Sequence, residues 1–518
     1  MDQEPATADA EALSGHAHGE RRVRRRRVRR DALELEQRPR SLYLFRRDLR
    51  LGDHAGLAEA ARFGDVVPAV IVEPDLERRL ARNPRRAAYY CGAVSSLAAA
   101  LAVRGVALIV RRGTLRAEAL RLARESRAAT IGWSAAYDAA TIANDRDLQA
   151  AFEEAGLRVA LAHDAPAIAP DETAAVRAHD DGTGYRAFTP YLTAWRSRTR
   201  ATYGANVRYA LVALDSNPLP SPDTFGAEAL ADADVPSEAK TLSAFDAYLA
   251  GPALAYRTAR SVPAEAATAR LSAALSFGIV SARTLLARID ARYADRFLLA
   301  EERASLAALT RALAQRDFFL QLGWFYETSP DLVLQTRMRA FAFARSHPAL
   351  EAWRFGRTGF PFVDAGMRQL RATGWMHPRA RLVAASFLCY DLGVDWRVGR
   401  DAWDDLLVED EPALATGNWQ WTAGVGADLA QYPRIFNPRK QARWFDPAGT
   451  YVRRWIPELA NLPGAAVLDP AASIARPQLA LPLFDGAEYA APVVDHEATA
   501  RAFLARYAVF ARPKDERR

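Results

Sequence analysis

Residues 41–45 read Ser-Leu-Tyr-Leu-Phe, and residues 66–72 read Val-Val-Pro-Ala-Val-Ile-Val. Both runs are short and rich in residues that favour β-strands. Similar runs follow at 106–110, 130–133 and 157–161. Segments in which apolar residues recur with helical spacing lie at 85–104, 115–124 and 142–156. This alternation predicts an α/β domain over residues 41–165, with a doubly wound parallel sheet covered by helices.

The predicted loops after these strands lack the two common phosphate-binding motifs. Neither G-x-G-x-x-G nor G-x-x-x-x-G-K-[ST] follows any of the five runs. In doubly wound folds, ligands bind beyond the carboxyl ends of the strands. We therefore expect any ligand of this domain to be held without a P-loop or a dinucleotide-binding fingerprint.

The rest of the chain divides into segments of different composition. Residues 166–245 contain more Pro, Gly and Asp, and they predict a connecting segment with short helices. Over residues 246–475 nearly every segment has helical spacing and few β-branched runs, which predicts a second, all-α domain. Residues 476–518 are expected to form a carboxyl-terminal extension with one final helix.

Composition excludes several classes of protein. The 518 residues are 50% hydrophobic and 25% charged, which is typical of a globular protein. No run of about 18 apolar residues occurs, so we expect no membrane span. Cys91 and Cys389 are the only cysteines, which excludes a disulfide scaffold and a four-cysteine zinc or iron-sulfur site. We expect no metal site and a reducing, cytoplasmic location.

The first 40 residues contain a dense run of arginines. The net charge is +7, and the run from Arg21 to Arg30 alone holds eight arginines. This run lacks an apolar face, and no apolar core of a secretion signal accompanies it, so we expect a disordered basic tail over residues 1–40. Residues 1–40 hold ten arginines and eight acidic residues, so the rest of the chain keeps a net charge of +5, and we expect any nucleic-acid surface to be a local patch on it.

The predicted helical domain is rich in tryptophan and arginine. No H-E-x-x-H zinc motif and no G-x-S-x-G nucleophile motif occurs in the chain. Eight of the eleven tryptophans lie between Trp353 and Trp455, interleaved with arginines. A single tryptophan is most often a core residue, but rings interleaved with guanidinium groups also suit a large planar ligand, phosphates or bases.

Several motifs of this region follow one another in a fixed order. They are Gly374-Trp375-Met376-His377, Arg379, Arg381, Ala385-Ser386-Phe387-Leu388, Asp395-Trp396-Arg397, Gly417-Asn418-Trp419-Gln420-Trp421 and Arg434-Ile435-Phe436-Asn437-Pro438. With Phe45-Arg46-Arg47-Asp48-Leu49-Arg50-Leu51 near the start, this order resembles the photolyase/cryptochrome flavoprotein family, and in particular its class I-type DNA photolyases. The resemblance extends over about residues 41–510 and includes a final helix.

The resemblance implies one FAD in the helical domain. Tyr256 precedes Thr268-Ala269-Arg270-Leu271-Ser272 by twelve residues, which matches the family's phosphate-binding pattern. The alternative for this segment is a simple helix N-cap. The other FAD-binding residues that the resemblance implies are Arg316, Arg381, Glu409, Asp410 and Glu411.

Five positions near the flavin and the lesion depart from the family's pattern. Glu409 and Glu411 stand where the family usually has Asp, and Ala415 stands where it usually has an Asn that faces flavin N5. In members that repair cyclobutane dimers, a Glu and a Trp contact the lesion, whereas this chain has Ala312 and Gln315. The first loss removes a charge-assisted hydrogen bond worth about 1.5–3 kcal/mol, and the second removes base stacking worth about 1–3 kcal/mol.

The family passes electrons to the flavin along three tryptophans. Trp419 and Trp396 match the inner two, whereas Phe343 stands at the outer position. Phenylalanine is hard to oxidise, so the chain needs another exit. Trp353 is the nearest candidate and Tyr390 is an alternative, while a purely structural role for Phe343 is equally compatible with the sequence.

The resemblance also implies damaged DNA and a second chromophore. Arg260, Arg379 and Arg434 match phosphate-binding positions and Trp421 matches a lesion contact. The lesion must be flipped out, because it is unreachable inside the base stack. The amino-terminal domain of the family often holds a light-harvesting folate or deazaflavin, and Asp138 stands where folate-binding members carry Glu. The alternative is a solvated helix-start role for Asp138.

Two functions are therefore compatible with the sequence. The first is a FAD-dependent, blue-light-driven DNA photolyase that repairs pyrimidine photoproducts as a monomer, with no membrane and no obligate protein partner. The second is a cryptochrome-like blue-light receptor with weak or no repair activity, which Ala312, Gln315, Ala415 and Phe343 favour. The arginines retained at the DNA-facing positions favour the enzyme.

Overall fold

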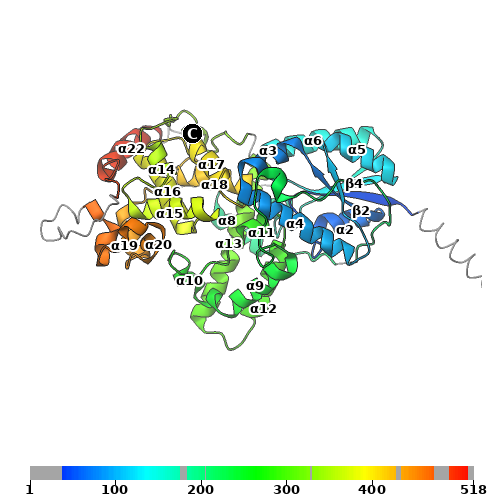
Figure 1. Cartoon of the computed structure of the whole chain (residues 1–518), viewed down its shortest axis with the longest axis horizontal. Coiled ribbons are helices and arrows are strands. Elements are labelled where there is room, and N and C mark those ends of the chain that lie inside the picture. The colour runs from blue at the N-terminus through cyan, green and yellow to red at the C-terminus, as the bar shows by residue number, and fades with distance from the viewer. Residues whose placement is uncertain are drawn as a thin grey trace, which may run out of the picture.

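The computed structural model describes residues 38–175, 184–204, 206–265, 267–326, 329–427, 433–471 and 489–511. Nearly all of the predicted basic tail therefore lies outside the described residues. An α/β part occupies one end of the molecule and a larger helical part occupies the other (Figure 1).

Five parallel strands form the amino-terminal sheet in the order β3-β2-β1-β4-β5. They are β1 (Arg40–Phe45), β2 (Asp65–Val72), β3 (Ile109–Arg112), β4 (Thr130–Ser134) and β5 (Arg158–Ala162). Every residue of β2 is buried, which is why its sequence reads as a continuous apolar run rather than an alternating one. The predicted doubly wound parallel sheet is confirmed.

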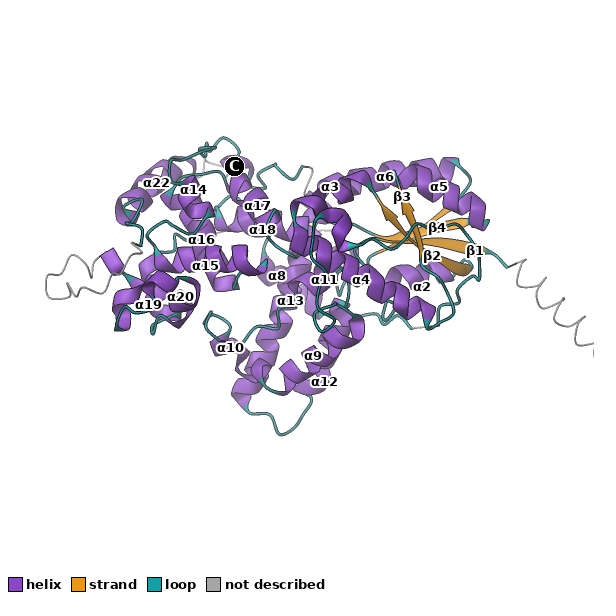
Figure 2. Cartoon of the chain, in the orientation of Figure 1, coloured by secondary structure: helices purple, strands orange, loops and turns teal. Residues whose placement is uncertain are grey.

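Helices lie on both faces of this sheet (Figure 2). They are α2 (Ala55–Ala61), α4 (Pro84–Ala102), α5 (Leu115–Ser126) and α6 (Ala139–Glu154), with α3 (Pro74–Arg82) before α4. The segments predicted at 85–104, 115–124 and 142–156 correspond to α4, α5 and α6. The sequence did not reveal α2, because seven residues are too few to show a helical period.

Several helices lie within and across the end of the connecting segment. The connecting segment holds α7 (Pro170–Ala174), α8 (Phe188–Arg196) and η1 (Pro222–Phe225), and α9 (Glu238–Ala250) then runs across the boundary expected at residue 246. The following elements are η2 (Pro252–Ala255), α10 (Tyr256–Ala259), α11 (Ser272–Ser276), α12 (Ala282–Tyr293) and α13 (Ala300–Tyr326). The long helix α13 packs against α8, α10, α12 and α18 and so forms the centre of this part.

Shorter helices follow in the rest of the described residues. They are η3 (Thr336–Met338), α14 (Leu350–Arg354), α15 (Pro361–Thr373), α16 (Pro378–Ser386), η4 (Phe387–Asp391), α17 (Trp396–Asp404), α18 (Pro412–Thr422), α19 (Pro438–Phe445), α20 (Thr450–Trp455), η5 (Pro457–Leu459), η6 (Gly464–Leu468) and α22 (His496–Ala511). The final helix expected near residues 498–510 is present as α22. The buried His496 binds Asp391 of η4 at 2.6 Å, which fixes the start of α22 to the core.

A buried ion-pair network joins the two parts. Asp164, which follows β5, lies 2.8 Å from Arg50 after β1 and 2.9 Å from Arg283 on α12. It also accepts a hydrogen bond from the backbone N–H of Ala55 at 2.8 Å. The charges of Arg50 and Arg283 lower the pKa of Asp164 although burial acts to raise it. Asp164 is therefore ionised, and its ion pairs link the sheet to the helices.

Backbone contacts reinforce this joint at Gly278. This residue has a φ of 62°, and a Cβ there would lie 2.3 Å from the carbonyl oxygen of Arg47. The neighbouring Phe277 carbonyl accepts a hydrogen bond from the N–H of Leu49 at 3.0 Å. A side chain at position 278 would therefore force the two parts to separate locally.

Asp317 on α13 provides a second buried acid. It accepts hydrogen bonds from Trp195 Nε1 at 3.0 Å and from the backbone N–H of Ala167 at 2.8 Å. Its side chain is almost completely buried, and burial raises its pKa to about 6 despite the nearby charge of Arg316. The folded state thus favours protonated Asp317, whose usual pKa is near 3.9.

Asp317→Asn should therefore remove part of the pH dependence of stability. A raised pKa stabilises the fold below about pH 4, and this contribution is lost as the pH rises through about 6. At about 1.36 kcal/mol per pKa unit, the variant should gain about 3 kcal/mol over wild type between pH 4 and pH 7. Urea denaturation at both pH values measures the difference. The exposed Asp75→Asn serves as control, and equal pH profiles for wild type and D317N would contradict the expectation.

Candidate functional site

The acidic segment 409–411 lies between α17 and α18 and meets two arginines. Arg381 on α16 binds Glu409 at 2.5 Å, and Arg316 on α13 lies 3.4 Å from Glu411. Burial raises the pKa of Glu411, although Arg316 counteracts the effect. Four of the residues implied by the family pattern, far apart in sequence, thus form two neighbouring ion pairs.

Helix α11, which begins at Ser272, lies against this acidic segment. The backbone N–H of Asp410 donates to Ser276 Oγ on α11 at 3.1 Å, so α11 is tied to residues 409–411. The N-cap position of α11 is Leu271, and no side chain caps the helix. Thr268 therefore does not cap α11.

Several arginines lie close to His377, next to these elements. Burial, together with the charges of Arg379, Arg381 and Arg270, lowers the pKa of His377 to about 4. Arg270 has a φ of 49° and lies over the ring of Trp375 at 4.2 Å. His377 Nε2 and Arg379 Nε are buried without a hydrogen-bond partner within the described residues. A backbone-strained arginine, buried nitrogen atoms without hydrogen-bond partners and several positive charges thus lie close together. Such groups fit the phosphates and ring edges of FAD.

Two further arginines extend this cationic surface. Arg379 donates to Ser261 Oγ at 3.0 Å, lies over the ring of Phe445 at 4.1 Å, and its pKa is lowered by burial and by the charge of Arg260. Across the ranges that the structure covers, neither Arg260 nor Arg379 forms an ion pair with a carboxylate. Arg260 also lies over the ring of Tyr256 at 5.6 Å. The structure thus places the predicted phosphate-binding residues Arg260 and Arg379 together.

Arg434 and Trp421 form a separate pair. The guanidinium of Arg434 lies 5.4 Å from the ring centre of Trp421, and the arginine is exposed. On α13, Ala312 is half-buried and Gln315 is exposed. They are three residues apart and so lie on the same face of the helix.

The predicted electron-transfer residues are buried. Trp419, Trp396 and Trp353 are 4%, 0% and 0% exposed, so Trp353, the expected exit, has no contact with solvent. Phe343 lies against Phe341 with ring centres 4.8 Å apart, as a packing residue would. Sequence reasoning did not single out Trp403, although it belongs to the same tryptophan-rich region.

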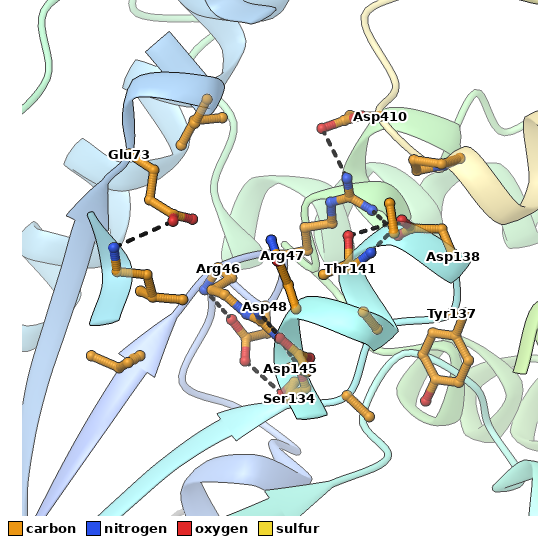
Figure 3. A pocket seen from close by; sticks show the side chains of 18 of the residues that line it. Arg46, Arg47, Asp48, Glu73, Ser134, Tyr137, Asp138, Thr141, Asp145 and Asp410 are labelled. Atoms are coloured by element: carbon orange, nitrogen blue, oxygen red, sulfur yellow. Dashed lines mark hydrogen bonds and ion pairs between the residues drawn. The ribbon is translucent and has the colours of Figure 1, made fainter. Parts of the chain in front are cut away.

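A second site lies at the carboxyl edge of the sheet (Figure 3). A pocket of about 670 Å³ is lined by the segments that follow β1 and β4 and by residues 410–412. β1 and β4 flank the point where the strand order reverses, which is where doubly wound folds bind ligands. The pocket therefore lies between the two parts of the chain.

Asp138 lies in this pocket at the start of α6. Its Oδ1 accepts hydrogen bonds from the N–H and the hydroxyl of Thr141, so it caps the helix. The residue is buried rather than solvated, however, and its Oδ2 has no hydrogen-bond partner among the described residues. Arg47 lies 3.8 Å from that oxygen. A ligand with N–H donors could bind there without disturbing the cap.

Asp410 faces the same pocket. It binds Arg47 at 3.4 Å and also Arg79 of α3. These charges and that of Arg86 lower its pKa although burial acts to raise it, and its Oδ1 is unpartnered in the described structure. The structure thus separates Asp410 from Glu409, which points to Arg381, even though the two are adjacent in sequence.

Two absences complete the description. Among the residues that the structure describes, no group of three or more His, Cys, Asp or Glu side chains could hold a metal ion. In the same residues, none of the helices combines the length and the apolar character that crossing a membrane requires.

Comparison with known proteins agrees with this architecture. Residues 41–211 match the family model described as DNA photolyase, and residues 309–509 match the FAD binding domain of DNA photolyase. A deoxyribodipyrimidine photo-lyase of Halobacterium salinarum is 34% identical over 477 residues, which are 88% of this chain and 96% of the relative.

Two solved structures are also similar. A Synechocystis cryptochrome has a TM-score of 0.77 at 26% identity, over 90% of this chain and 98% of the other. A photolyase of Sulfolobus tokodaii with two FAD molecules has a TM-score of 0.75 at 25% identity, over 90% and 99%. The two-domain fold and the matched FAD-binding domain define a flavoprotein. The chain belongs to the DNA photolyase family.

Proposed function

We propose that this chain is a FAD-dependent, blue-light-driven DNA photolyase that repairs pyrimidine photoproducts. The observation that carries the proposal is the cationic surface around Arg260 and Arg379, which has no carboxylate partner within the described residues and adjoins the FAD-binding elements. Unpaired arginines on a body of small net charge favour a local phosphate contact. The relative named deoxyribodipyrimidine photo-lyase supports the same activity.

The residues that would hold FAD come from several helices. They are Tyr256, Thr268, Ala269, Arg270, Leu271, Ser272, Arg316, Arg381, Glu409 and Glu411, with Asp410 fixing the acidic segment through its backbone N–H. Reduced FAD, when bound, supplies an electron to the lesion under blue light. The ion pairs of Arg381 and Arg316 hold the acidic segment in place, and the low pKa of His377 keeps its ring neutral.

The DNA-facing residues would position the damaged strand. Arg260, Arg379 and Arg434 would bind phosphates on either side of the lesion, and Trp421 would contact the flipped bases. Ala312 and Gln315 provide neither an acid nor an aromatic ring on α13. We therefore infer weaker binding of cyclobutane dimers than in members that carry both groups.

The second candidate function is a cryptochrome-like blue-light receptor. Ala312, Gln315, Ala415 and Phe343 favour it, and a cryptochrome shares the fold. The unpaired Arg260 and Arg379 favour repair, because a receptor that does not bind DNA gains nothing from two adjacent, uncompensated cations.

We infer a light-harvesting chromophore, a folate or a deazaflavin, in the pocket at the sheet edge. Asp138 Oδ2 and Asp410 Oδ1 would accept hydrogen bonds from the N–H groups of such a ring. A neighbouring photolyase structure contains two FAD molecules, which supports a second chromophore of some kind. We further infer a cytoplasmic monomer, since Cys91 and Cys389 are free thiols.

A repair assay tests the main proposal. The purified protein with reduced FAD should remove a defined pyrimidine photoproduct from duplex DNA under blue light and not in the dark. Arg379→Ala should weaken binding of the damaged duplex by about tenfold to a hundredfold, and it should reduce the log–log salt slope by about one unit. Comparison with undamaged duplex removes the contribution of the arginine-rich tail.

The matched control is Arg62→Ala, which removes an exposed arginine of the amino-terminal part. This variant should bind and repair DNA as wild type does. A protein that binds FAD but neither prefers damaged DNA nor repairs any lesion in light would refute the photolyase proposal and favour the receptor.

A further inference from the structure

Arg86 on α4 is a buried cation that neither the FAD-binding nor the DNA-facing set includes. Its side chain is 1% exposed. Within the described residues its only carboxylate partner is Asp404, the last residue of α17, at 2.9 Å, and the Asp404 side chain is itself 46% exposed. A buried guanidinium is costly unless its N–H groups find acceptors. The other acceptors of Arg86 therefore indicate its role.

Backbone carbonyl groups between α17 and α18 supply these acceptors. Nη2 of Arg86 donates to the carbonyl oxygens of Asp404 at 2.7 Å, of Leu407 at 3.0 Å and of Glu409 at 3.1 Å. Its Nε also donates to Leu407 at 3.2 Å. The carbonyl at the end of a helix has no acceptor-satisfying partner within that helix, and here the guanidinium takes that place. Arg86 therefore determines the course of the backbone over residues 404–409.

Asn83, the N-cap residue of α4, donates to the same segment. Its Nδ2 donates to the carbonyl oxygen of Leu407 at 2.9 Å, while its Oδ1 accepts a hydrogen bond from the backbone N–H of Arg86 at 3.1 Å. One side chain thus caps the helix and holds the segment at the same time. The start of α4, in the sheet domain, is therefore fixed to residues 404–409 of the helical part.

Glu409 connects this contact to the FAD-binding residues. Its carbonyl oxygen faces Arg86, whereas its carboxylate binds Arg381 at 2.5 Å. Arg381 is held on its other side, because its Nε donates to the carbonyl oxygen of Met376 at 2.8 Å. A rotation of the backbone at residue 409 would therefore move the carboxylate away from an arginine that cannot follow it.

We propose that Arg86 is a positioning residue for FAD binding. From the sheet domain it fixes the backbone of residues 404–409, so that the Glu409 carboxylate lies against Arg381. Arg86 acts on the cofactor through Glu409. This inference rests on the proposed role of Glu409 and Arg381 in holding FAD.

Arg86→Met and Glu409→Gln, alone and combined in the full chain, test this role. Arg86→Met should speed the release of FAD from the holoprotein at least about tenfold, because charge-assisted hydrogen bonds to the segment are lost. In the Glu409→Gln background the same substitution should change the rate less than about twofold, since the group through which Arg86 acts is already altered. The rise of flavin fluorescence after dilution measures release. Equal acceleration in both backgrounds would show a general packing defect and overturn the inference.

Arg82→Ala is the matched control. Arg82 lies four residues before Arg86 and pairs with Asp405 of the same segment, but both side chains are exposed. Pairs at the surface contribute little, so this variant should release FAD at the wild-type rate. Acceleration by Arg82→Ala as large as that by Arg86→Met would mean that any contact with this segment matters equally, which overturns the specific role of Arg86.

Asn83→Asp keeps the test decisive if Arg86→Met does not fold. Asp also caps helices, so the start of α4 is retained, while the N–H donor to Leu407 is lost. This variant should speed FAD release in the same direction as Arg86→Met, and an unchanged rate would contradict the inference. If the wild-type protein holds no FAD, as its visible spectrum would show, the proposed function itself fails.

Discussion

Asp164→Ala should lower the free energy of unfolding by about 3–5 kcal/mol, the usual cost of breaking a buried ion pair by removing one partner. Arg50 would be left buried without a counter-charge, Arg283 would keep only Asp53, and the N–H of Ala55 would lose its acceptor. Chemical denaturation at pH 7 measures the loss. Because the pKa of Asp164 is lowered in the folded protein, its contribution in wild type is present above about pH 4 and is lost as the pH falls further.

Glu59→Ala provides the control for this experiment. It breaks an ion pair with Arg62 on the surface, and pairs of this kind contribute about 0–1 kcal/mol. Equal losses for D164A and E59A would show that the buried network does not hold the two parts together.

Ala312→Glu combined with Gln315→Trp should strengthen binding of a cyclobutane dimer by about 2.5–6 kcal/mol, if the two contributions add. Glu at 312 would restore a charge-assisted hydrogen bond, and Trp at 315 would restore a stacking surface on the same face of α13. Gln315 is exposed and Ala312 is only half-buried, so larger side chains can be directed away from the core. Fluorescence anisotropy with duplexes that carry one dimer measures the gain.

Ala308→Glu places the same negative charge one turn earlier on α13 and should give no gain for the damaged duplex. An unchanged affinity in the double variant would mean that this face of α13 does not meet the lesion. It would leave the FAD assignment intact, because none of the FAD-binding ion pairs involves these two positions.

The amino-terminal fold could be predicted because its signals are local. Each strand is a short β-rich run, and α4, α5 and α6 are long enough to show a helical period. Helix α9 crosses residue 246, in a region whose proline and glycine content predicts a connection with short helices, because composition alone does not locate a helix boundary. Helix α2 has seven residues and gives no reliable period.

The sequence predicts residues of the candidate site only where they belong to a recognisable motif. The resemblance named Arg381, Glu409 and Asp138, and the local spacing of Asp138 and Thr141 also fits a helix cap. It did not show that Asp410 turns away from Glu409 to bind Arg47, because that contact joins residues 363 positions apart. The carbonyl partners of Arg86 could not be known before α4 was packed against the end of α17.

The position of Arg283 limits where this chain can be cut into separate fragments. Arg283 lies on α12, between the two matched ranges 41–211 and 309–509, yet it closes around Asp164 of the sheet domain. A fragment that begins after residue 165 would keep Arg283 but lose both of the acids that it pairs with, Asp53 and Asp164. A fragment or chimaera of this flavoprotein should therefore contain residues 53 and 164 together with α12. A chain cut near residue 165, where the sheet domain ends, should yield two insoluble halves.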